Sequence, residues 1–168
     1  MSDKDLAEAL RVAGRYIDFA ERTERQVRQR LERAEFEPAT IDEALERLTA
    51  AGLVDDTRFA DQWAEGRTRT RCHGPARLAA DMRRQGLDAD EIDQALAGLA
   101  PEQTREAAIA FLRRRAPAGG ADADAVRRLA AMLRRRGHSG DTIRTALRTV
   151  LGAEPDDDAP DGAGEDTP

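Results

Sequence analysis

The sequence has few of the residues that catalytic and disulfide-stabilised proteins use. Its 168 residues include one cysteine, two histidines and only 4% aromatic residues. A single cysteine excludes an intrachain disulfide, and a lone thiol is typical of a reducing compartment. Cys72 and His73 are neighbours at an expected helix end, where adjacent side chains point about 100° apart and do not converge on one metal ion. We expect no metal site, no cofactor and no enzymatic activity.

Long apolar runs and lysine are also scarce. No apolar run approaches the roughly 18 residues of a membrane span. The first ten residues, MSDKDLAEAL, do not contain the basic segment followed by an apolar segment that is typical of a signal peptide. Of the 27 basic residues, 26 are arginine and only Lys4 is lysine. We expect a cytoplasmic protein with no membrane partner.

The acidic residues are unevenly distributed. The net charge is −6, but residues 152–168 contain seven Asp or Glu and no Lys or Arg, so residues 1–151 have a net charge of +1. The last 17 residues are rich in Pro and Gly and have no apolar face. A segment of this composition cannot bury enough apolar surface to fold, so we predict a disordered acidic C-terminal tail over residues 152–168.

The clearest signal in the sequence is an internal repeat with a period of 51 residues. Six columns are apolar in all three copies, and they are Val27/Leu78/Leu129, Leu31/Met82/Leu133, Ile41/Ile92/Ile143, Ala44/Ala95/Ala146, Leu45/Leu96/Leu147 and Leu48/Leu99/Val150. Repeated units of this size stack on their neighbours and bury together what one unit could not bury alone.

The spacing within each copy is helical. Apolar residues recur every three or four positions, and no useful stretch alternates with period two. Capping pairs such as Thr23 with Gln26 and Asp88 with Glu91, together with Pro38, mark expected helix starts. We therefore predict an elongated all-α fold of three tandem three-helix repeats, nine helices in all, over residues 1–54, 55–100 and 101–151.

One position conflicts with this repeat. Gly86 and Gly137 stand at the end of the second helix in the second and third copies, where a left-handed residue commonly ends a helix. The first copy has Glu35 in that column, and a glutamate at positive φ is strained. We therefore predict that the helix before Glu35 ends differently, without a left-handed residue there.

Arginines cluster at the C-terminal ends of the expected helices. Codon bias and the favourable interaction of cations with a helix C-terminus both explain such clusters. Arginine also binds carboxylate or phosphate in a bidentate manner, and stacked repeats would place matching helix ends along one side of the array. On this second interpretation the partner-binding residues are Arg67, Arg69, Arg71, Arg77, Arg83, Arg84, Arg113, Arg114, Arg115, Arg134, Arg135 and Arg136.

The second copy also resembles a known family. Its features are Leu-Val-Asp-Asp at 53–56, Arg58-Phe59-Ala60, arginines at 67 and 71, the Gly74-Pro75 break, and Gly86 followed by an Ile-centred helix. These features resemble the RecX regulators of bacterial recombination, with weaker similarity over residues 5–151. The resemblance implies three tandem three-helix repeats that bind the RecA nucleoprotein filament in its groove. It also implies lower ATP hydrolysis and strand exchange, without chemistry by the protein itself.

Three hypotheses for function stay open at this point. The first is a regulator that binds RecA filaments, as the resemblance implies. The second is direct binding of single- or double-stranded DNA through the arginine clusters, for which affinity would fall steeply with salt. The third is a helical scaffold for another protein. We expect a monomer in each case.

Overall fold

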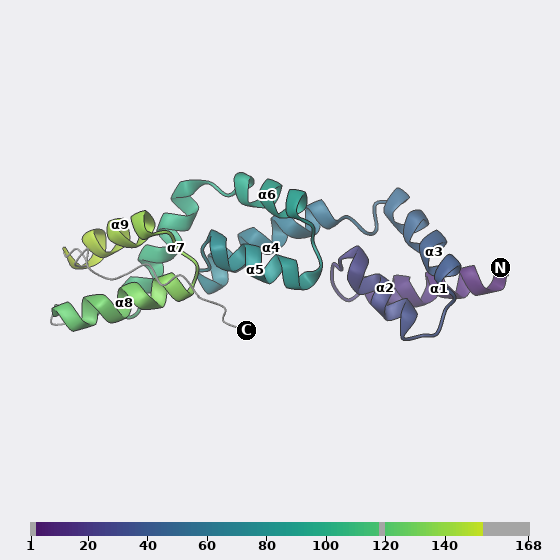
Figure 1. Cartoon of the computed structure of the whole chain (residues 1–168), viewed down its shortest axis with the longest axis horizontal. Coiled ribbons are helices and arrows are strands. Elements are labelled where there is room, and N and C mark those ends of the chain that lie inside the picture. The colour runs from purple at the N-terminus through teal and green to yellow at the C-terminus, as the bar shows by residue number, and fades with distance from the viewer. Residues whose placement is uncertain (1–2, 118–119, 153–168) are drawn as a thin grey trace, which may run out of the picture.

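The computed structural model describes residues 3–117 and 120–152, and within these ranges it contains helices and no strands. The helices follow one another along the long axis of the molecule (Figure 1). We call α1–α3 unit 1, α4–α6 unit 2 and α7–α9 unit 3. The bounds are α1 Asp3–Ile17, α2 Glu24–Glu32, α3 Pro38–Ala50, α4 Asp56–Arg71, α5 Pro75–Gln85, α6 Ala89–Gly98, α7 Pro101–Arg113, α8 Ala123–Arg135 and α9 Gly140–Leu151.

The predicted all-α, elongated array of three-helix repeats is confirmed by this architecture. The predicted domain limits at residues 54, 100 and 151 stay a prediction. The predicted acidic tail lies outside the described residues apart from Gly152, which ends α9 with a left-handed conformation.

The predicted apolar columns form the cores of the three units. Four columns are buried in every copy, and they are Val27/Leu78/Leu129, Leu31/Met82/Leu133, Ile41/Ile92/Ile143 and Ala44/Ala95/Ala146. Each unit has a separate cluster of buried apolar residues. Two columns deviate, because Leu96 and Val150 are only partly buried at the edges of their clusters, whereas the other members of their columns are buried.

All three units end their second helix with the same left-handed turn. Glu35 has φ 60°, Gly86 has φ 99° and Gly137 has φ 82°. The residue after each turn donates a backbone hydrogen bond to the carbonyl five positions earlier, from Phe36, Leu87 and His138 at 3.4, 3.3 and 3.2 Å. The prediction that Glu35 avoids positive φ is therefore wrong, because the helix-capping hydrogen bonds of the repeat offset the strain of its side chain.

We expect the substitution Glu35→Gly to stabilise the protein by about 1 kcal/mol. A non-glycine residue at positive φ costs about 1–2 kcal/mol, and part of the gain is lost to the larger backbone entropy of glycine in the unfolded chain. Urea unfolding followed by circular dichroism measures the change. Gly86→Ala is the matched control and should lower stability, since a Cβ there meets the side chain of Arg25. A Glu35→Gly variant that is less stable than the wild type contradicts this account.

The units are joined by related hydrogen bonds at the start of α2 and of α5. At the first joint, Thr23 Oγ1 donates to the carbonyl of Gln85 at 3.0 Å. At the second, the backbone N–H of Gly74 donates to the carbonyl of Arg136 at 2.8 Å. Gly74 lies 51 residues after Thr23, and Arg136 lies 51 residues after Gln85. The repeat therefore determines how the units stack as well as how each unit folds.

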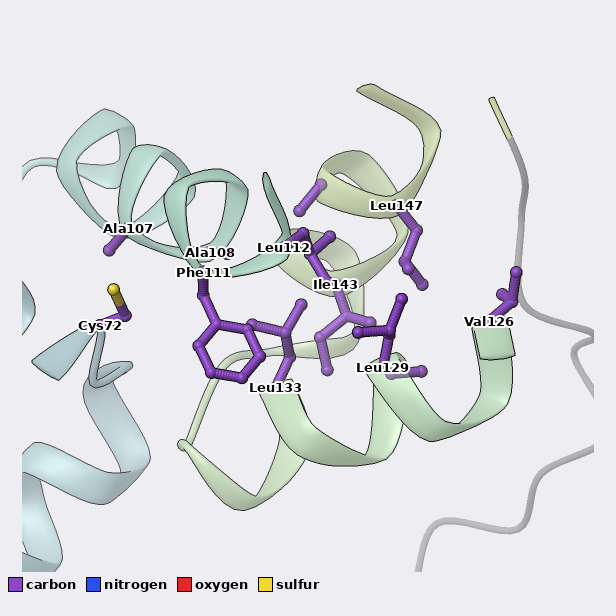
Figure 2. Packing of buried hydrophobic residues seen from close by; sticks show 12 residues of the cluster. Cys72, Ala107, Ala108, Phe111, Leu112, Val126, Leu129, Leu133, Ile143 and Leu147 are labelled. Carbon is purple, nitrogen blue, oxygen red and sulfur yellow. The ribbon is translucent and has the colours of Figure 1, made fainter. Parts of the chain in front are cut away.

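The two joints differ in what else they contain. At the first, Glu24 N donates to Asp56 Oδ1 at 2.8 Å, and Arg58 Nε contacts Glu21 Oε1 at 2.9 Å. No buried apolar cluster in the described residues includes members of both unit 1 and unit 2. At the second joint, Cys72 follows α4 of unit 2 and joins the core of unit 3, beside Ala107 (Figure 2). The second joint is therefore part of an apolar core.

Candidate interaction surface

Four helix ends meet at the joint between units 2 and 3. They are the C-terminal ends of α4, α7 and α8 and the N-terminal end of α5. The backbone N–H of Ala76 donates to the carbonyl of Gly137 at 3.2 Å, and Arg136 Nη1 donates to the carbonyl of Arg71 at 2.5 Å. A Cβ at Gly74 would lie 2.5 Å from the Gly137 oxygen, so only glycine permits this approach.

A recess of about 380 Å³ opens at this joint, and we call it the joint pocket. Its lining residues are His73, Arg77, Phe111, Arg115, Met132, Arg135 and Arg136. The Phe111 side chain is 2% exposed, and the guanidinium carbons of Arg115 and Arg136 lie 4.3 and 4.4 Å from its ring centroid. The aromatic ring thus positions two arginines by cation–π contacts.

Positive charge in the joint pocket is only partly neutralised. Burial lowers the pKa of Arg136, and the neighbouring Arg115 and Arg114 lower it further. The nearest carboxylate is Asp81, which forms an ion pair with Arg77 at 3.1 Å. In the described part of the chain, no ion pair to Arg115, Arg135 or Arg136 is present. Their guanidinium groups are available for carboxylate or phosphate oxygens, which arginine binds through paired hydrogen bonds.

Two histidines lie at the same joint, and the pKa of each is lowered. His138 is 4% exposed, and its Nε2 lies 3.0 Å from the Cys72 carbonyl oxygen, so Nε2 carries the proton and donates it. Burial lowers the pKa of His138, and the charge of Arg136 adds to this effect. Burial also lowers the pKa of His73, opposed by Asp81. His138 is therefore a packed residue, in the column that Phe36 and Leu87 occupy in the other two copies.

Comparisons with known proteins identify the family. Models of the first and second three-helix domains of RecX match residues 9–48 and 55–96. The chain is 36% identical over 150 residues to regulatory protein RecX of Thermobifida fusca, covering 88% of this chain and 81% of that protein. It is 37% identical over 143 residues to regulatory protein RecX of Mycobacterium leprae, covering 83% of this chain and 84% of that protein. The chain belongs to the RecX family.

The fold agrees with this RecX membership. A crystal structure of RecX from Lactobacillus salivarius superposes with a TM-score of 0.80 at 18% sequence identity. The superposition covers 89% of this chain and 98% of that one. A second crystal structure, of a regulatory protein RecX, gives a TM-score of 0.72 at 21% identity. At these sequence identities the superpositions show a shared fold. Each covers 89% of this chain, so the shared fold includes residues of all three units.

Of the twelve predicted arginines in this RecX chain, seven lie at or beside the joint between units 2 and 3. Four line the joint pocket, and three more lie beside it. The four are Arg77, Arg115, Arg135 and Arg136, and the three are Arg67, Arg71 and Arg114. The arginines gather because helix ends of two units converge at one joint, whereas the sequence interpretation placed them in a strip along the array.

The other five predicted arginines are elsewhere. Arg83 and Arg84 lie at the opposite end of α5 from Gly74, and Arg84 forms an ion pair with Asp81. Arg69 lines a second recess of about 340 Å³ between α4 and α7, which also contains Glu65, Glu106 and Arg114 and so has no excess of positive charge. Arg113 and Arg134 are exposed next to the joint residues in sequence.

Sequence reasoning missed three of the pocket-lining residues, His73, Phe111 and Met132. For Phe111 a signal was present, because it precedes Arg115 by four residues and such pairs lie on the same face of a helix. The same spacing on α4 places Arg67 over the ring of Trp63, with the guanidinium carbon 4.2 Å from the ring centroid. An aromatic residue four positions before an arginine therefore identifies two of the arginines that are held in place, Arg67 and Arg115, but not Arg136.

In residues 3–117 and 120–152, no group of three or more His, Cys, Asp or Glu side chains could hold a metal ion. No helix over these residues has both the length and the hydropathy that crossing a membrane requires.

We expect stability to fall as the pH is lowered from about 7.5 to 5.5, and His138→Leu to reduce this fall. The pKa of His138 is lowered in the folded state. The unfolded chain therefore binds more protons near the ordinary histidine pKa of about 6.5, and the free energy of unfolding decreases as pH falls through that value. Leucine is the matched replacement because Leu87 fills the same column of unit 2. Urea unfolding at several pH values measures the slope, and an unchanged slope in the variant would contradict the assignment.

Proposed function

We propose that this chain is a non-enzymatic regulator that binds the RecA nucleoprotein filament in its groove and lowers ATP hydrolysis and strand exchange. It would act as a monomer in the cytoplasm, in recombination and DNA repair. The observation that carries the proposal is the 36% identity to regulatory protein RecX of Thermobifida fusca over 88% of this chain. The elongated array supports it, because stacked repeats present an extended surface to a periodic partner.

A titration against the RecA protein of the same organism tests this function. The full chain is added to RecA on single-stranded DNA, and ATP hydrolysis is followed at saturating nucleotide. We expect the hydrolysis rate to fall as the chain approaches a fixed ratio to RecA. Strand exchange measured in parallel should fall over the same range. Unchanged rates with a stoichiometric amount of folded protein overturn the proposal, and capture of another protein in place of RecA would favour the scaffold hypothesis.

The joint pocket is the part of the surface that we expect to contact the filament. Its unpaired arginines suit acidic side chains of a protein or phosphates of DNA. Reversing the charge of Arg115 and Arg135 together should weaken inhibition about tenfold or more, since each lost charge-assisted contact costs about 1.5–3 kcal/mol. Both side chains are exposed, so the fold should persist, as circular dichroism can check.

The matched control changes the same charge elsewhere on unit 3. Arg105 on α7 and Arg128 on α8 are exposed and do not line the joint pocket. The double variant Arg105→Glu with Arg128→Glu should inhibit as the wild type does. Equal loss in both double variants would mean that net charge alone matters. Arg84 is unsuitable for this test, because its reversal would also break the ion pair to Asp81.

Direct DNA binding is a second candidate function, and the unpaired arginines of the joint pocket favour it. Contacts to three phosphates would give a slope of about −2 in a plot of log affinity against log salt for single strands. Fluorescence anisotropy with a labelled oligonucleotide measures this slope without RecA. No binding at low salt would exclude this candidate and leave filament binding to be decided by the ATPase titration.

A further inference from the structure

The joint pocket has more positive charge than the described residues neutralise. Arg77, Arg115, Arg135 and Arg136 line it, and the one carboxylate close by, Asp81, is shared with Arg84 outside the pocket. Phe111 and the Arg71 carbonyl hold Arg136 in place, so little side-chain freedom remains to be lost on binding an anion. These arginines form a cluster of positive charge at the ends of three helices, and Arg136 is already held in place.

The same chain contains a segment of complementary charge. Residues 153–168 include seven Asp or Glu and no Lys or Arg. Its acids come in two groups, Glu154 with Asp156 to Asp158, and Asp161 with Glu165 and Asp166.

The segment begins within reach of the joint pocket. α9 starts at the joint, because Ser139 caps it directly after the buried His138, and it extends away from α5 (Figure 1). Its 12 residues span about 18 Å. From Gly152, the nine residues to Asp161 can span about 30 Å when extended. The second acidic group can therefore return along α9 to the joint, whereas the first group is barely long enough to do so.

We propose that the acidic segment 153–168 docks in the joint pocket of its own chain, through Asp161, Glu165 and Asp166, and competes there with anionic partners. Carboxylates pair with the unpaired guanidinium groups of Arg115 and Arg135 in the way that external carboxylates or phosphates would. A tether of this length gives an effective concentration of about 1 mM, so even a weak contact fills the pocket for much of the time. The docking does not depend on whether RecA is the partner.

Paramagnetic relaxation in the full chain tests this docking. A nitroxide is attached through Ala163→Cys, and the natural Cys72, 2% exposed, should stay unmodified under the same conditions. A contact with a dissociation constant near the effective concentration of about 1 mM fills the pocket about half of the time. We therefore expect the amide signals of Arg77, Arg115 and Arg135 to fall about twofold or more at low salt.

Two comparisons decide the outcome. At 1 M salt, where the Debye length is about 3 Å, the signals should recover. Neutralising the pocket with Arg115→Gln and Arg135→Gln should abolish the effect, whereas Arg105→Gln with Arg128→Gln should leave it unchanged. Joint signals that are insensitive to the label overturn the docking, as does broadening that persists in the neutralised pocket. Neither result bears on the ATPase titration, so failure of one proposal is distinguishable from failure of the other.

Discussion

Gly137→Ala is expected to destabilise the protein by about 3–4 kcal/mol. Gly137 has φ 82°, and a Cβ there would collide with the backbone nitrogen of Arg77. The left-handed conformation costs an alanine about 1–2 kcal/mol. Relieving the collision separates units 2 and 3 and breaks the hydrogen bonds from Gly74 to Arg136 and from Ala76 to Gly137, each worth about 0.5–1.5 kcal/mol.

Gly52→Ala is the matched control for this substitution. Gly52 has φ 67°, and nothing lies within 4 Å of an added Cβ. The same strain then acts without the collision, so we expect a loss of only about 1–2 kcal/mol. Urea unfolding gives the total, and hydrogen exchange resolved along the chain shows whether α5 and α8 lose protection together. Equal losses in the two variants would mean that the close approach at the joint contributes nothing to stability.

Leu133→Ala is expected to lower stability by about 3–5 kcal/mol. Leu133 is 0% exposed in the core of unit 3, beside Phe111 and Leu129 (Figure 2). Truncation removes buried apolar surface and leaves a cavity that helices anchored on both sides cannot close. In a repeat array the loss acts first on the affected unit and its joint. Hydrogen exchange should therefore increase in α7–α9 before it increases in α1–α3.

Leu53→Ala is the control for this truncation. Leu53 is 52% exposed, so the same atoms are removed from a site that water already reaches. The expected change lies within about 0.5 kcal/mol. A Leu133→Ala variant as stable as Leu53→Ala would contradict the alignment of the three copies, because Leu31, Met82 and Leu133 share one column.

The internal architecture of each unit was predictable because it depends on short-range spacing. Helical periodicity identified Leu31, Met82 and Leu133 as core residues, and all three are buried. Capping residues gave the start of α6 at Asp88, whose side chain accepts from Glu91 N at 2.9 Å. These features need only the sequence within about one helix, where local propensities and tertiary packing agree.

What failed were inferences that depended on contacts between units. Glycine in the columns of Gly86 and Gly137 was attributed to the left-handed turn alone. In the structure the added Cβ would also meet Arg25 or Arg77 of the preceding unit. Unit 1 has no preceding unit, so Glu35 experiences only the strain and tolerates it.

The sequence predicted which residue type forms the candidate site, but it did not predict where in the fold these residues meet. The sequence identified arginine-rich helix ends, including those with Arg115 and Arg135. It could not show that α4, α7 and α8 end at one point, because residues 71 and 136 are brought together only by the joint. Spacing within a helix also could not separate Arg77, which lines the pocket, from Arg84, which pairs with Asp81 away from it.

The contrast between the two joints leads us to expect that units 2 and 3 resist bending as one body and that unit 1 can pivot against them. Opening the second joint would expose Cys72 and disturb the core that contains Phe111. Opening the first would break the hydrogen bond from Thr23 to Gln85 and would release ion pairs such as Arg58 with Glu21, which contribute little at the surface. We therefore expect bending to be easier between unit 1 and unit 2 than between units 2 and 3. On a partner built of regularly spaced subunits, units 2 and 3 would together determine which subunits the chain contacts. Unit 1 could then adjust its position to local differences in subunit spacing.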